Sequence, residues 1–542
     1  MHNKTRNPTG WGFVEDAMSP AERKALIPMA GALFGGQLPE AVAAPTAADI
    51  TLPPSRLAIP ESLAHVLSDD HDARVLHARG RSYPDLVALR RTALTEAPDV
   101  VATPENEQAL LDILDWCAHS KAAVIPFGGG SSVVGGVNAE GMGAFDGVVT
   151  LSLQAMDQVH DIDQRAATVH AGAGILGPAL ESAVKAQGLA VRHFPQSYFH
   201  SSLGGWVATR GAGHFSTQHA KIEDRVQALR VVLPDGRIAE TQRLPAGSVG
   251  VDPNRLWCGS EGALGVITSV WLRCVREPQH RVGCGVAFDD FPSALEAARM
   301  LLQSGIYPTQ LRILDPYEHM ISRLMAGRSA KGALMVLAFE SAGAPVDGLL
   351  QAAQDIAAEH GGRVQQGGDS DGTGDWKNTF FRQPYLRDAM LDHAGVVDTF
   401  ETAVLWSQLP EAYHGIRQRV LDALQRECGG GAVTCRVTHA YSDGCCLYFG
   451  FFAPGRRDAL TTQWQAIRDA AAEAVTAFGG TASHHHAMGR MHRGYARDEL
   501  PEAFIDALHG ARSRLDPEGR MNPGLLPEPM RATMLAPTGS SA

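Results

Sequence analysis

The sequence Pro-Phe-Gly-Gly-Gly-Ser-Ser-Val-Val-Gly-Gly, at residues 126–136, follows the apolar run 122–125 and contains three consecutive glycines. Glycine lacks a Cβ and reaches positive φ at little cost, so the N–H groups of residues 128–130 can turn together toward an anion. The hydroxyls of Ser131 and Ser132 add two further donors. This stretch therefore predicts a loop that binds a pyrophosphate.

The spacing of these glycines differs from the dinucleotide-binding fingerprint. That fingerprint places its glycines as G-x-G-x-x-G, with a helix directly after them and an acidic residue further on. Here the glycines are contiguous, and Val133 and Val134 follow the two serines. We expect a phosphate loop of another kind, and the three glycines alone are equally compatible with an ordinary glycine-rich turn.

Hydrophobic periodicity around the loop predicts a strand–helix–strand unit. Residues 100–104 read as a strand, residues 105–121 carry apolar side chains at helical spacing, and Val124 and Ile125 belong to a second strand. The glycines would then lie at a strand end. Further strands at 147–153 and 167–174, a helix at 178–188 and a hairpin from 226 around the turn 234–236 follow.

Two more segments are rich in glycine and hydroxyl side chains. One is residues 194–213, which include Ser201-Ser-Leu-Gly-Gly-Trp, and the other is Gly259-Ser-Glu-Gly-Ala-Leu-Gly-Val-Ile-Thr. Such segments pack closely on a flat partner and offer many N–H and O–H donors. Together with residues 126–136 they indicate one extended, flat ligand that carries phosphates.

Composition narrows the class of protein. The chain has 542 residues, 47 basic and 59 acidic side chains and a net charge of −12, which argues against general binding of nucleic acid. No apolar run approaches the roughly 20 residues of a spanning helix, and no signal peptide or peroxisomal address is present. We expect a cytoplasmic protein of two or more domains whose eight scattered cysteines are reduced.

The second half of the sequence reads as α+β. Strands are predicted at 282–288, 310–315 and 333–340, helices at 292–305 and 349–361, and a hairpin at 437–452 around Ser442-Asp-Gly. Residues 367–374, Gly-Gly-Asp-Ser-Asp-Gly-Thr-Gly, read as a flexible loop. The last part holds the triplet His484-His485-His486.

The three glycine-rich motifs resemble the flavin-binding signatures of the vanillyl-alcohol oxidase / p-cresol methylhydroxylase superfamily. The resemblance implies FAD, extended between two α+β subdomains with its pyrophosphate on the loop that begins at Pro126. The FAD-binding residues that it implies are Pro126, Phe127, Gly128, Gly129, Gly130, Ser131, Ser132, Pro195, Gln196, Ser197, Ser201, Ser202, Gly204, Gly205, Ala208, Thr209, Arg210, Gly211, Glu261, Gly262, Ala263, Leu264, Gly265, Val266 and Ile267.

Motifs of the second half resemble the alkyldihydroxyacetonephosphate synthase family more specifically. They are Leu311-Arg-Ile-Leu-Asp, Tyr385-Leu-Arg-Asp, Asp398-Thr-Phe-Glu-Thr, Cys435-Arg-Val-Thr-His-Ala-Tyr, Cys446-Leu-Tyr-Phe and Ser483-His-His-His-Ala-Met-Gly. The resemblance implies exchange of the acyl group of acyl-dihydroxyacetone phosphate for a fatty alcohol, through a flavin N5 adduct. It also implies ether lipid synthesis and a homodimer. A greasy substrate and the apolar patch 26–33 favour peripheral contact with a membrane.

The family resemblance and the changes in composition and periodicity along the sequence together divide the chain into four parts. We expect an N-terminal extension at 1–95 and a FAD-binding domain of p-cresol methylhydroxylase type at 96–278. A cap or substrate domain follows at 279–480, and a C-terminal segment with the histidine motif at 481–542 returns to the flavin. We expect the FAD to be non-covalent, although His193, His200 and His214 are candidates for attachment.

Two side chains fit the chemistry of such a site. A tyrosine carries protons when cationic neighbours lower its pKa, and Tyr448 is the candidate to take or return a proton at the substrate's C1. Arg387 offers a guanidinium fork for a phosphate or carboxylate. Arg382 and Lys377 are competing anion anchors, and His439 and Tyr441 flank the hairpin of Tyr448.

Arg312 and the histidine triplet leave alternatives open. Arg312 is either catalytic or a structural partner of Asp315, because arginine in a core strand usually has a carboxylate partner. If the triplet is a strand, His484 and His486 face one way and His485 the other. Without an interleaved cysteine or carboxylate we predict no metal, and we favour a catalytic proton relay by the histidines.

Two other functions compete with the synthase reading. A flavin dehydrogenase of D-2-hydroxy acids, of the lactate or glycolate type, shares the glycine-rich loops and also uses an arginine for its substrate. A non-catalytic flavin-binding protein is the third possibility. Convergence of a cation, a phenol and imidazoles in one cavity would argue against a mere binder.

Overall fold

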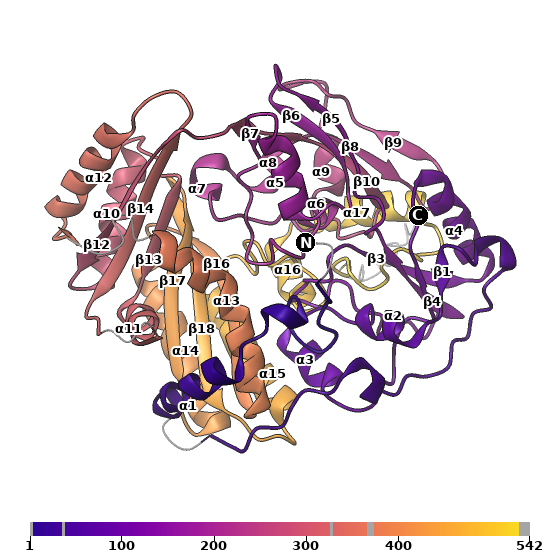
Figure 1. Cartoon of the computed structure of the whole chain (residues 1–542), viewed down its shortest axis with the longest axis horizontal. Helices are drawn as coiled ribbons and strands as arrows, with labels where there is room; N and C mark the ends of the chain where they lie inside the picture. The colour runs from indigo at the N-terminus through magenta and orange to yellow at the C-terminus, as the bar shows by residue number, and fades with distance from the viewer. Residues whose placement is uncertain (1–3, 35–37, 326–328, 366–372, 530–542) are drawn as a thin grey trace, which may run out of the picture.

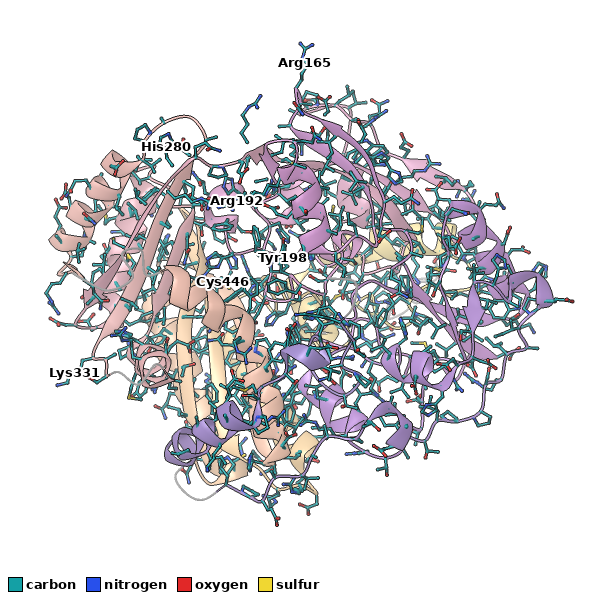
Figure 2. The ribbon with its side chains drawn as sticks, in the orientation of Figure 1. Arg165, Arg192, Tyr198, His280, Lys331 and Cys446 are labelled. Carbon is teal, nitrogen blue, oxygen red and sulfur yellow. The ribbon has the colours of Figure 1, made fainter. Side chains whose placement is uncertain are left out.

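The computed structural model describes residues 4–34, 38–325, 329–365 and 373–529 (Figure 1). Three larger sheets with helices packed on them make an α+β fold, as the sequence predicts. Figure 2 shows Cys446 near the middle of the molecule, whereas Arg165 and Lys331 lie at its outer edges.

The N-terminal residues wrap around both halves of the molecule. Their elements are α1 (Pro20–Phe34), β1 (Leu67–Ser68), α2 (His71–Leu76), α3 (Tyr83–Leu89) and short 3-10 helices at Val14–Asp16, Ala47–Asp49 and Glu61–Leu63. Leu26 and Ala30 of α1 are buried in a cluster with Leu386 and Met390. The prediction that residues 26–33 offer an apolar patch to a membrane is therefore wrong for Leu26 and Ala30, because both side chains are buried inside the protein.

The first sheet carries the glycine loop. Its order is β1-β2-β4-β3, where β2 (Val100–Ala102), β4 (Gly147–Ser152) and β3 (Ala122–Phe127) are parallel. Helix α4 (Glu107–His119) packs on it, and the side chain of its N-cap residue, Asn106, accepts from the amide of Ala109. The predicted strand–helix–strand unit is confirmed, and the glycines directly follow the end of β3.

A second, antiparallel sheet lies beside the first. Its order is β5 (Val159–Asp163), β6 (Thr168–Gly172), β10 (Val266–Arg273), β8 (Val226–Val232) and β9 (Ile238–Glu240). The helices of this region are α5 (Gly177–Lys185), α6 (Leu203–Ala208), α7 (Ser216–His219), α8 (Ile222–Arg225) and α9 (Asn254–Trp257), and β7 (Leu189–Ala190) pairs with β11 (Val275–Arg276). Both sheets share one hydrophobic core.

The third sheet has seven strands and forms the other half of the molecule. Its order is β15 (Arg363–Val364), β12 (His280–Phe288), β14 (Ala333–Ser341), β13 (Gln310–Leu314), β17 (Ala432–Ala440), β18 (Gly444–Pro454) and β16 (Gly395–Leu405). The helices of this half are α10 (Phe291–Gln303), α11 (Pro316–Met325), α12 (Asp347–Glu359), α13 (Thr373–Asp392), α14 (Leu409–Cys428) and α15 (Leu460–Ala477); α16 (Arg493–Glu499) and α17 (Glu502–Leu515) follow.

Alternation along β18 separates core from cavity. Cys445, Leu447, Phe449 and Phe451 are buried in the core that α10, α12, α14 and α15 share with the sheet. The residues between them, which include Tyr448, point to the opposite face, toward the first half of the chain. The period of two in the sequence thus positions the ionisable side chains.

Helix α13 was not expected from the sequence, and the loop predicted just before it is largely not described by the structure. Residues 380–388 belong to helix α13, which the sequence did not predict because Pro384 interrupts its interior. The predicted loop 367–374 lies largely outside the described residues, and α13 begins at Thr373. Among the described helices, none has the length and apolar composition needed to cross a bilayer.

Candidate active site

A large cavity lies between the glycine loops of the first half and strands β16–β18 of the third sheet. It encloses about 1910 Å³ of empty space, including the part open to solvent. One side, which we call the glycine wall, consists of residues 128–132, 195–197, 201–205 and 209–213. The other, the ionisable wall, consists of the facing residues of β16–β18, Arg312, Arg387, His485 and His486.

The glycine wall is held together by close approach of its own segments. A Cβ on Gly129 would overlap the carbonyl oxygen of His200, and one on Gly128 would overlap the hydroxyl of Ser202. Gly130 has φ of 66°. The contiguous glycines are therefore needed for packing of the loop against residues 200–202, as well as for any ligand.

Arg6 braces the same junction from outside. Its guanidinium donates to the carbonyl oxygens of Gly129 at 2.6 Å and His200 at 3.1 Å. Trp11 stacks edge-on against the His200 ring at 4.8 Å, and its amide donates to the Asp388 carboxylate at 2.6 Å. Sequence reasoning missed Arg6, because nothing local in residues 4–13 points to partners more than a hundred positions away.

The residues expected to bind FAD divide into two groups. Those that line the cavity are Gly128, Gly129, Gly130, Ser131, Ser132, Pro195, Gln196, Ser197, Ser201, Ser202, Gly205, Thr209 and Gly211. Those outside its lining are Pro126, Phe127, Gly204, Ala208, Arg210, Glu261, Gly262, Ala263, Leu264, Gly265, Val266 and Ile267. Several of the second group support the wall from behind, such as Glu261, which accepts from the Gly489 amide at 3.0 Å.

The ionisable wall is built on strand register. Arg436 of β17, Tyr448 of β18 and Glu401 of β16 are direct cross-strand neighbours in one row. The Arg436 guanidinium lies 4.3 Å from the Tyr448 ring centre and donates to Glu318 at 2.6 Å. The Tyr448 hydroxyl is 2.9 Å from the Thr399 hydroxyl. Cross-strand pairing therefore brings Glu401 beside Tyr448, although the two residues are 47 positions apart in the sequence.

Burial, more than the neighbouring cation, sets the acidity of Tyr448. Desolvation raises its pKa above the ordinary value, and Arg436 offsets only part of this effect. The sequence-based expectation of a pKa lowered by cationic neighbours is thus wrong in its net direction. Tyr448 is therefore an uncharged phenol at neutral pH.

Arg387 is the buried cation with the most hydrogen-bonding capacity to spare in this wall. It is 8% exposed, and its nearest carboxylate is Asp398 at 3.7 Å. Its Nε and one terminal nitrogen have no hydrogen-bond partner among the described residues. Arg382 pairs with Glu22 at 2.7 Å on the surface, and the Lys377 side chain lies outside the described part of the chain.

Arg312 and Asp315 are both buried, but they do not form the ion pair that would have given Arg312 a purely structural role. Arg312 donates to the carbonyl of His214 at 3.1 Å and lines the cavity. Asp315 accepts from the Tyr413 hydroxyl at 3.0 Å and from the Glu318 amide, and burial raises its pKa to about 6. The side chains point to opposite faces of the sheet end, which leaves Arg312 at the cavity.

The three histidines lie in a turn and not in a strand. His485 and His486 both line the cavity, so the predicted alternation of 484 and 486 against 485 is wrong. His484 instead contacts the Tyr441 hydroxyl at 2.5 Å through Nε2 and His485 at 3.0 Å through Nδ1. Burial lowers the pKa of all three to about 3, so they are neutral imidazoles.

A cluster that sequence spacing does not reveal surrounds the first two histidines. Potential ligand atoms of His439, Cys446, His484 and His485 lie within 4.8 Å of one another. Both ring nitrogens of His439 have hydrogen-bonding neighbours, Thr438 Oγ1 and the Gly213 carbonyl, each at 3.0 Å. The hydrogen bonds hold the cluster together, and the absence of a metal stays a prediction.

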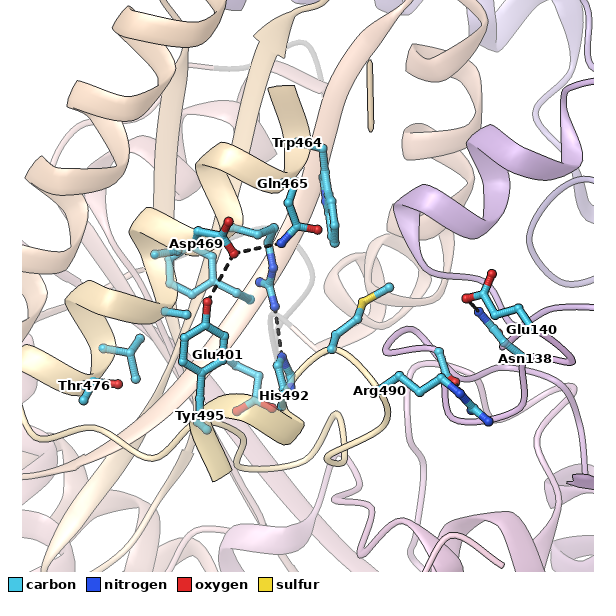
Figure 3. A pocket seen from close by; sticks show the side chains of 18 residues that line it. Asn138, Glu140, Glu401, Trp464, Gln465, Asp469, Thr476, Arg490, His492 and Tyr495 are labelled. Carbon is cyan, nitrogen blue, oxygen red and sulfur yellow. Dashed lines mark hydrogen bonds between the residues drawn. The ribbon is translucent and has the colours of Figure 1, made fainter. Parts of the chain in front are cut away.

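A second cavity of about 940 Å³, including its open part, lies behind the histidines (Figure 3). Glu401, Asp469, His492 and Tyr495 contribute to its lining, and the Tyr495 hydroxyl donates to Asp469 at 3.2 Å. Glu401 thus lies between the histidine turn and this polar space.

The main cavity suits the expected FAD. The glycine wall offers main-chain groups and hydroxyls without charged side chains along most of its length, as a dinucleotide requires. Unpaired nitrogens of Arg387 and Arg436 and the Thr434 hydroxyl face it from the other wall. Of His193, His200 and His214, only His214 is part of the cavity lining.

Comparison with known proteins finds two family matches in this chain. Residues 98–242 match the FAD binding domain family, and residues 277–526 match the C-terminal domain of FAD linked oxidases. The chain is 29% identical to an alkyldihydroxyacetonephosphate synthase of Trypanosoma brucei brucei, over 88% of this chain and 82% of that protein. It is 26% identical to a D-lactate dehydrogenase [cytochrome], mitochondrial, of Arabidopsis thaliana, over 85% of this chain and 78% of that protein.

The fold is also found among solved structures. A structure of alkyldihydroxyacetonephosphate synthase superimposes with a TM-score of 0.79 at 24% identity, covering 95% of this chain and 98% of that one. The likeness extends over both walls of the cavity and shows that the two halves of the chain adopt a known arrangement.

Proposed function

The chain is an alkyldihydroxyacetonephosphate synthase-like member of the FAD-linked oxidase family, and we propose that it exchanges the acyl group of acyl-dihydroxyacetone phosphate for a fatty alcohol. It is an FAD-dependent enzyme. The reaction yields an alkyl-dihydroxyacetone phosphate and a fatty acid, without net oxidation or reduction. When bound, FAD supplies the isoalloxazine ring at which this exchange is carried out.

The observation that carries the proposal is the position of a phenol, Tyr448, and two imidazoles, His485 and His486, in one cavity wall. Burial raises the pKa of Tyr448 and lowers the pKa of His485 and His486 to about 3. Burial thus keeps all three groups uncharged at neutral pH, the state in which a phenol can give a proton and an imidazole can accept one. At neutral pH Tyr448 Oη therefore holds a proton that it can give, while a ring nitrogen of His485 or His486 can accept one.

The same three groups serve both halves of the exchange. An imidazole takes the proton from C1 of the substrate, and the hydroxyl proton of the incoming alcohol later goes to the second imidazole and leaves with the released fatty-acid carboxylate. Tyr448 gives its proton back to C1 and is reprotonated through its neighbours, since its ring lies 5.5 Å from that of His486 and 5.9 Å from that of His485. The wall thus recycles protons, as a reaction without net redox change requires.

Arg387 and the apolar lining would bind the two ends of the substrate. The unpaired nitrogens of Arg387 suit two oxygens of a phosphate, which a guanidinium fork binds in bidentate fashion. Ile321, Leu386, Val397 and Phe452 add apolar surface on the same side of the cavity. This pairing of a cation with a greasy surface favours a lipid phosphate over a small polar substrate.

The direct test is to mix the protein with acyl-dihydroxyacetone phosphate and isotope-labelled hexadecanol. We expect a labelled ether product and one equivalent of fatty acid, with no electron acceptor consumed. Release of fatty acid without any ether, under conditions where the flavin is bound, would reject the synthase function.

A flavin-dependent D-2-hydroxy acid dehydrogenase is the second candidate, favoured by the similarity to D-lactate dehydrogenase. Arg387 would then bind the substrate carboxylate, and a neutral histidine would take the hydroxyl proton. Anaerobic addition of D-lactate or glycolate should bleach the flavin if this function holds. An unchanged flavin spectrum together with ether formation decides for the synthase.

Three further expectations belong to this proposal. We propose non-covalent FAD, since two of the three candidate histidines lie outside the cavity lining; acid precipitation should release the flavin into solution. From the family resemblance we propose a cytoplasmic homodimer with peripheral membrane contact. Light scattering after size exclusion and flotation with lipid vesicles test these two points.

A further inference from the structure

The histidine turn, which we define as residues 483–487, is wrapped around one buried carboxylate. Glu401 Oε1 accepts from the Ser483 hydroxyl at 3.0 Å and from the amides of His485 and His486 at 3.0 and 2.9 Å. Its Oε2 accepts from the His484 amide at 2.7 Å. The side chain is fully buried. Three consecutive amides that converge on an anion form a nest, here with the anion supplied by the protein itself.

A second contact holds the far end of the turn. Arg468 donates to His492 Nε2 at 3.0 Å, and His492 Nδ1 donates to the carbonyl of Ala487 at 2.9 Å. Ala487 has φ of 75°, in the left-handed region that residues other than glycine rarely adopt. Strain of this kind persists only where the surroundings impose it, and it gathers at functional sites.

We propose that Glu401, supported by the Arg468–His492 pair, is the positioning element that fixes His485 and His486 at the cavity while staying out of contact with the substrate. This inference rests on the proposed acid–base role of the two histidines. Glu401 Oε2 lies 3.8 Å from His485 Nδ1, and its Oε1 lies 3.9 Å from His486 Nδ1. The same carboxylate therefore sets both the place and the electrostatic environment of the imidazoles.

A carboxylate suits this place better than its amide. All four donors point at two oxygens, and a carboxylate only accepts hydrogen bonds. In a Glu401→Gln variant the oxygen would keep one set of donors, and the new NH₂ group would face an N–H or O–H at the other. The turn would have to move to relieve this opposition of donors.

The test compares Glu401→Gln with Glu499→Gln in the full-length flavin-loaded protein. Glu499 binds the same chain segment just before the turn, accepting from the Thr481 hydroxyl at 2.6 Å and the Ala482 amide at 2.8 Å, but at the surface. We expect both variants to keep FAD. For Glu401→Gln we expect kcat to fall about 100-fold, because a displacement near 1 Å has such an effect, with KM for both substrates little changed. Glu499→Gln should match the wild type.

Crystal structures of the two variants give a readout that does not depend on turnover. A displaced histidine turn in Glu401→Gln alone supports the proposal even if the wild type makes no ether, in which case only the proposed function fails. An unmoved turn, or an equal loss of kcat in Glu499→Gln, overturns it. If Glu401→Gln does not fold, His492→Leu decides in its place: it should shift Ala487 and lower kcat, and an unshifted turn overturns the proposal.

Discussion

The two walls of the cavity are built on opposite principles. The glycine wall uses main-chain groups and small side chains from contiguous stretches of sequence, such as residues 128–132. The ionisable wall uses charged and aromatic side chains that meet only through strand register, such as Arg436, Tyr448 and Glu401. Substitutions in the glycine wall are expected to act through steric overlap. Substitutions in the ionisable wall are expected to act through the loss of a charge or a proton.

The largest effect is expected from adding one methyl group to the glycine wall. In Gly129→Ala the new Cβ would overlap the carbonyl of His200, so the loop must separate from residues 200–202. We expect the flavin content of the purified variant to fall at least about tenfold, which corresponds to 1.4 kcal/mol of binding. Absorbance of the flavin relative to the protein measures this.

Gly143→Ala is the matched control, because a Cβ there meets nothing within 4 Å. It should bind flavin as the wild type does. Full flavin content in Gly129→Ala would show that the glycine wall tolerates a side chain at this position. The two walls would then not differ in the way described above.

In the ionisable wall, the expected loss is one of turnover with the flavin still bound. Tyr448→Phe removes the proton at Oη and keeps the ring on which Arg436 packs. We expect kcat to fall about 1000-fold, in the range of general acid–base catalysis. Tyr495→Phe, at the second cavity, should leave turnover unchanged. Retention of full activity by Tyr448→Phe would reject Tyr448 as the proton carrier.

Arg387→Lys keeps the charge of the ionisable wall and removes only the fork. Hydrogen bonds to charged groups contribute about 1.5–3 kcal/mol, so KM for acyl-dihydroxyacetone phosphate should rise about 10-fold to 100-fold. Steady-state kinetics measure this rise. Arg382→Lys, whose side chain pairs with Glu22 at the surface, serves as control. An unchanged KM in Arg387→Lys would place the phosphate elsewhere.

The smallest expected effect concerns how the free energy of unfolding depends on pH. A titrating group in the ionisable wall and one behind the glycine wall should change this energy in opposite directions. His486 has a pKa near 3 when folded, so below pH 6.5 only the unfolded chain takes up its proton and the free energy of unfolding falls. Glu261, behind the glycine wall, has its pKa raised to about 7, so the folded state gains stability as pH falls from 7 toward 4.5.

Urea unfolding at pH 7.5 and 5.5 checks both signs. His486→Gln should lose less stability on acidification than the wild type, and Glu261→Gln should lose more. Each difference approaches about 1.4 kcal/mol per pH unit. Differences of the same sign in the two variants would contradict the assignment of these groups.

Sequence reasoning predicted local structure well where a period or a turn signal is short-ranged. The unit around residues 100–127 and the hairpin of β17 and β18 both follow from local patterns. Helix α13 was missed because Pro384 argues against a helix, and tertiary packing overrides that preference.

The site was predicted less completely where its contacts join residues that are far apart in the sequence. Glu401 appeared only as part of a motif, yet its carboxylate organises the histidine turn. Arg6 gave no signal, since its partners are the carbonyls of Gly129 and His200. Tyr448 was chosen correctly as a cavity residue, but the direction of its pKa shift depends on burial, which the sequence does not show.

The contacts of Arg6 and Trp11 also constrain the order of events on the ribosome. Arg6 donates to the carbonyls of Gly129 and His200, and the Trp11 amide donates, across 377 positions, to Asp388. The contact with Asp388 cannot form until most of the polypeptide has been translated. The cofactor is therefore expected to be captured after synthesis, by a nearly finished chain, and not by the nascent N-terminal half.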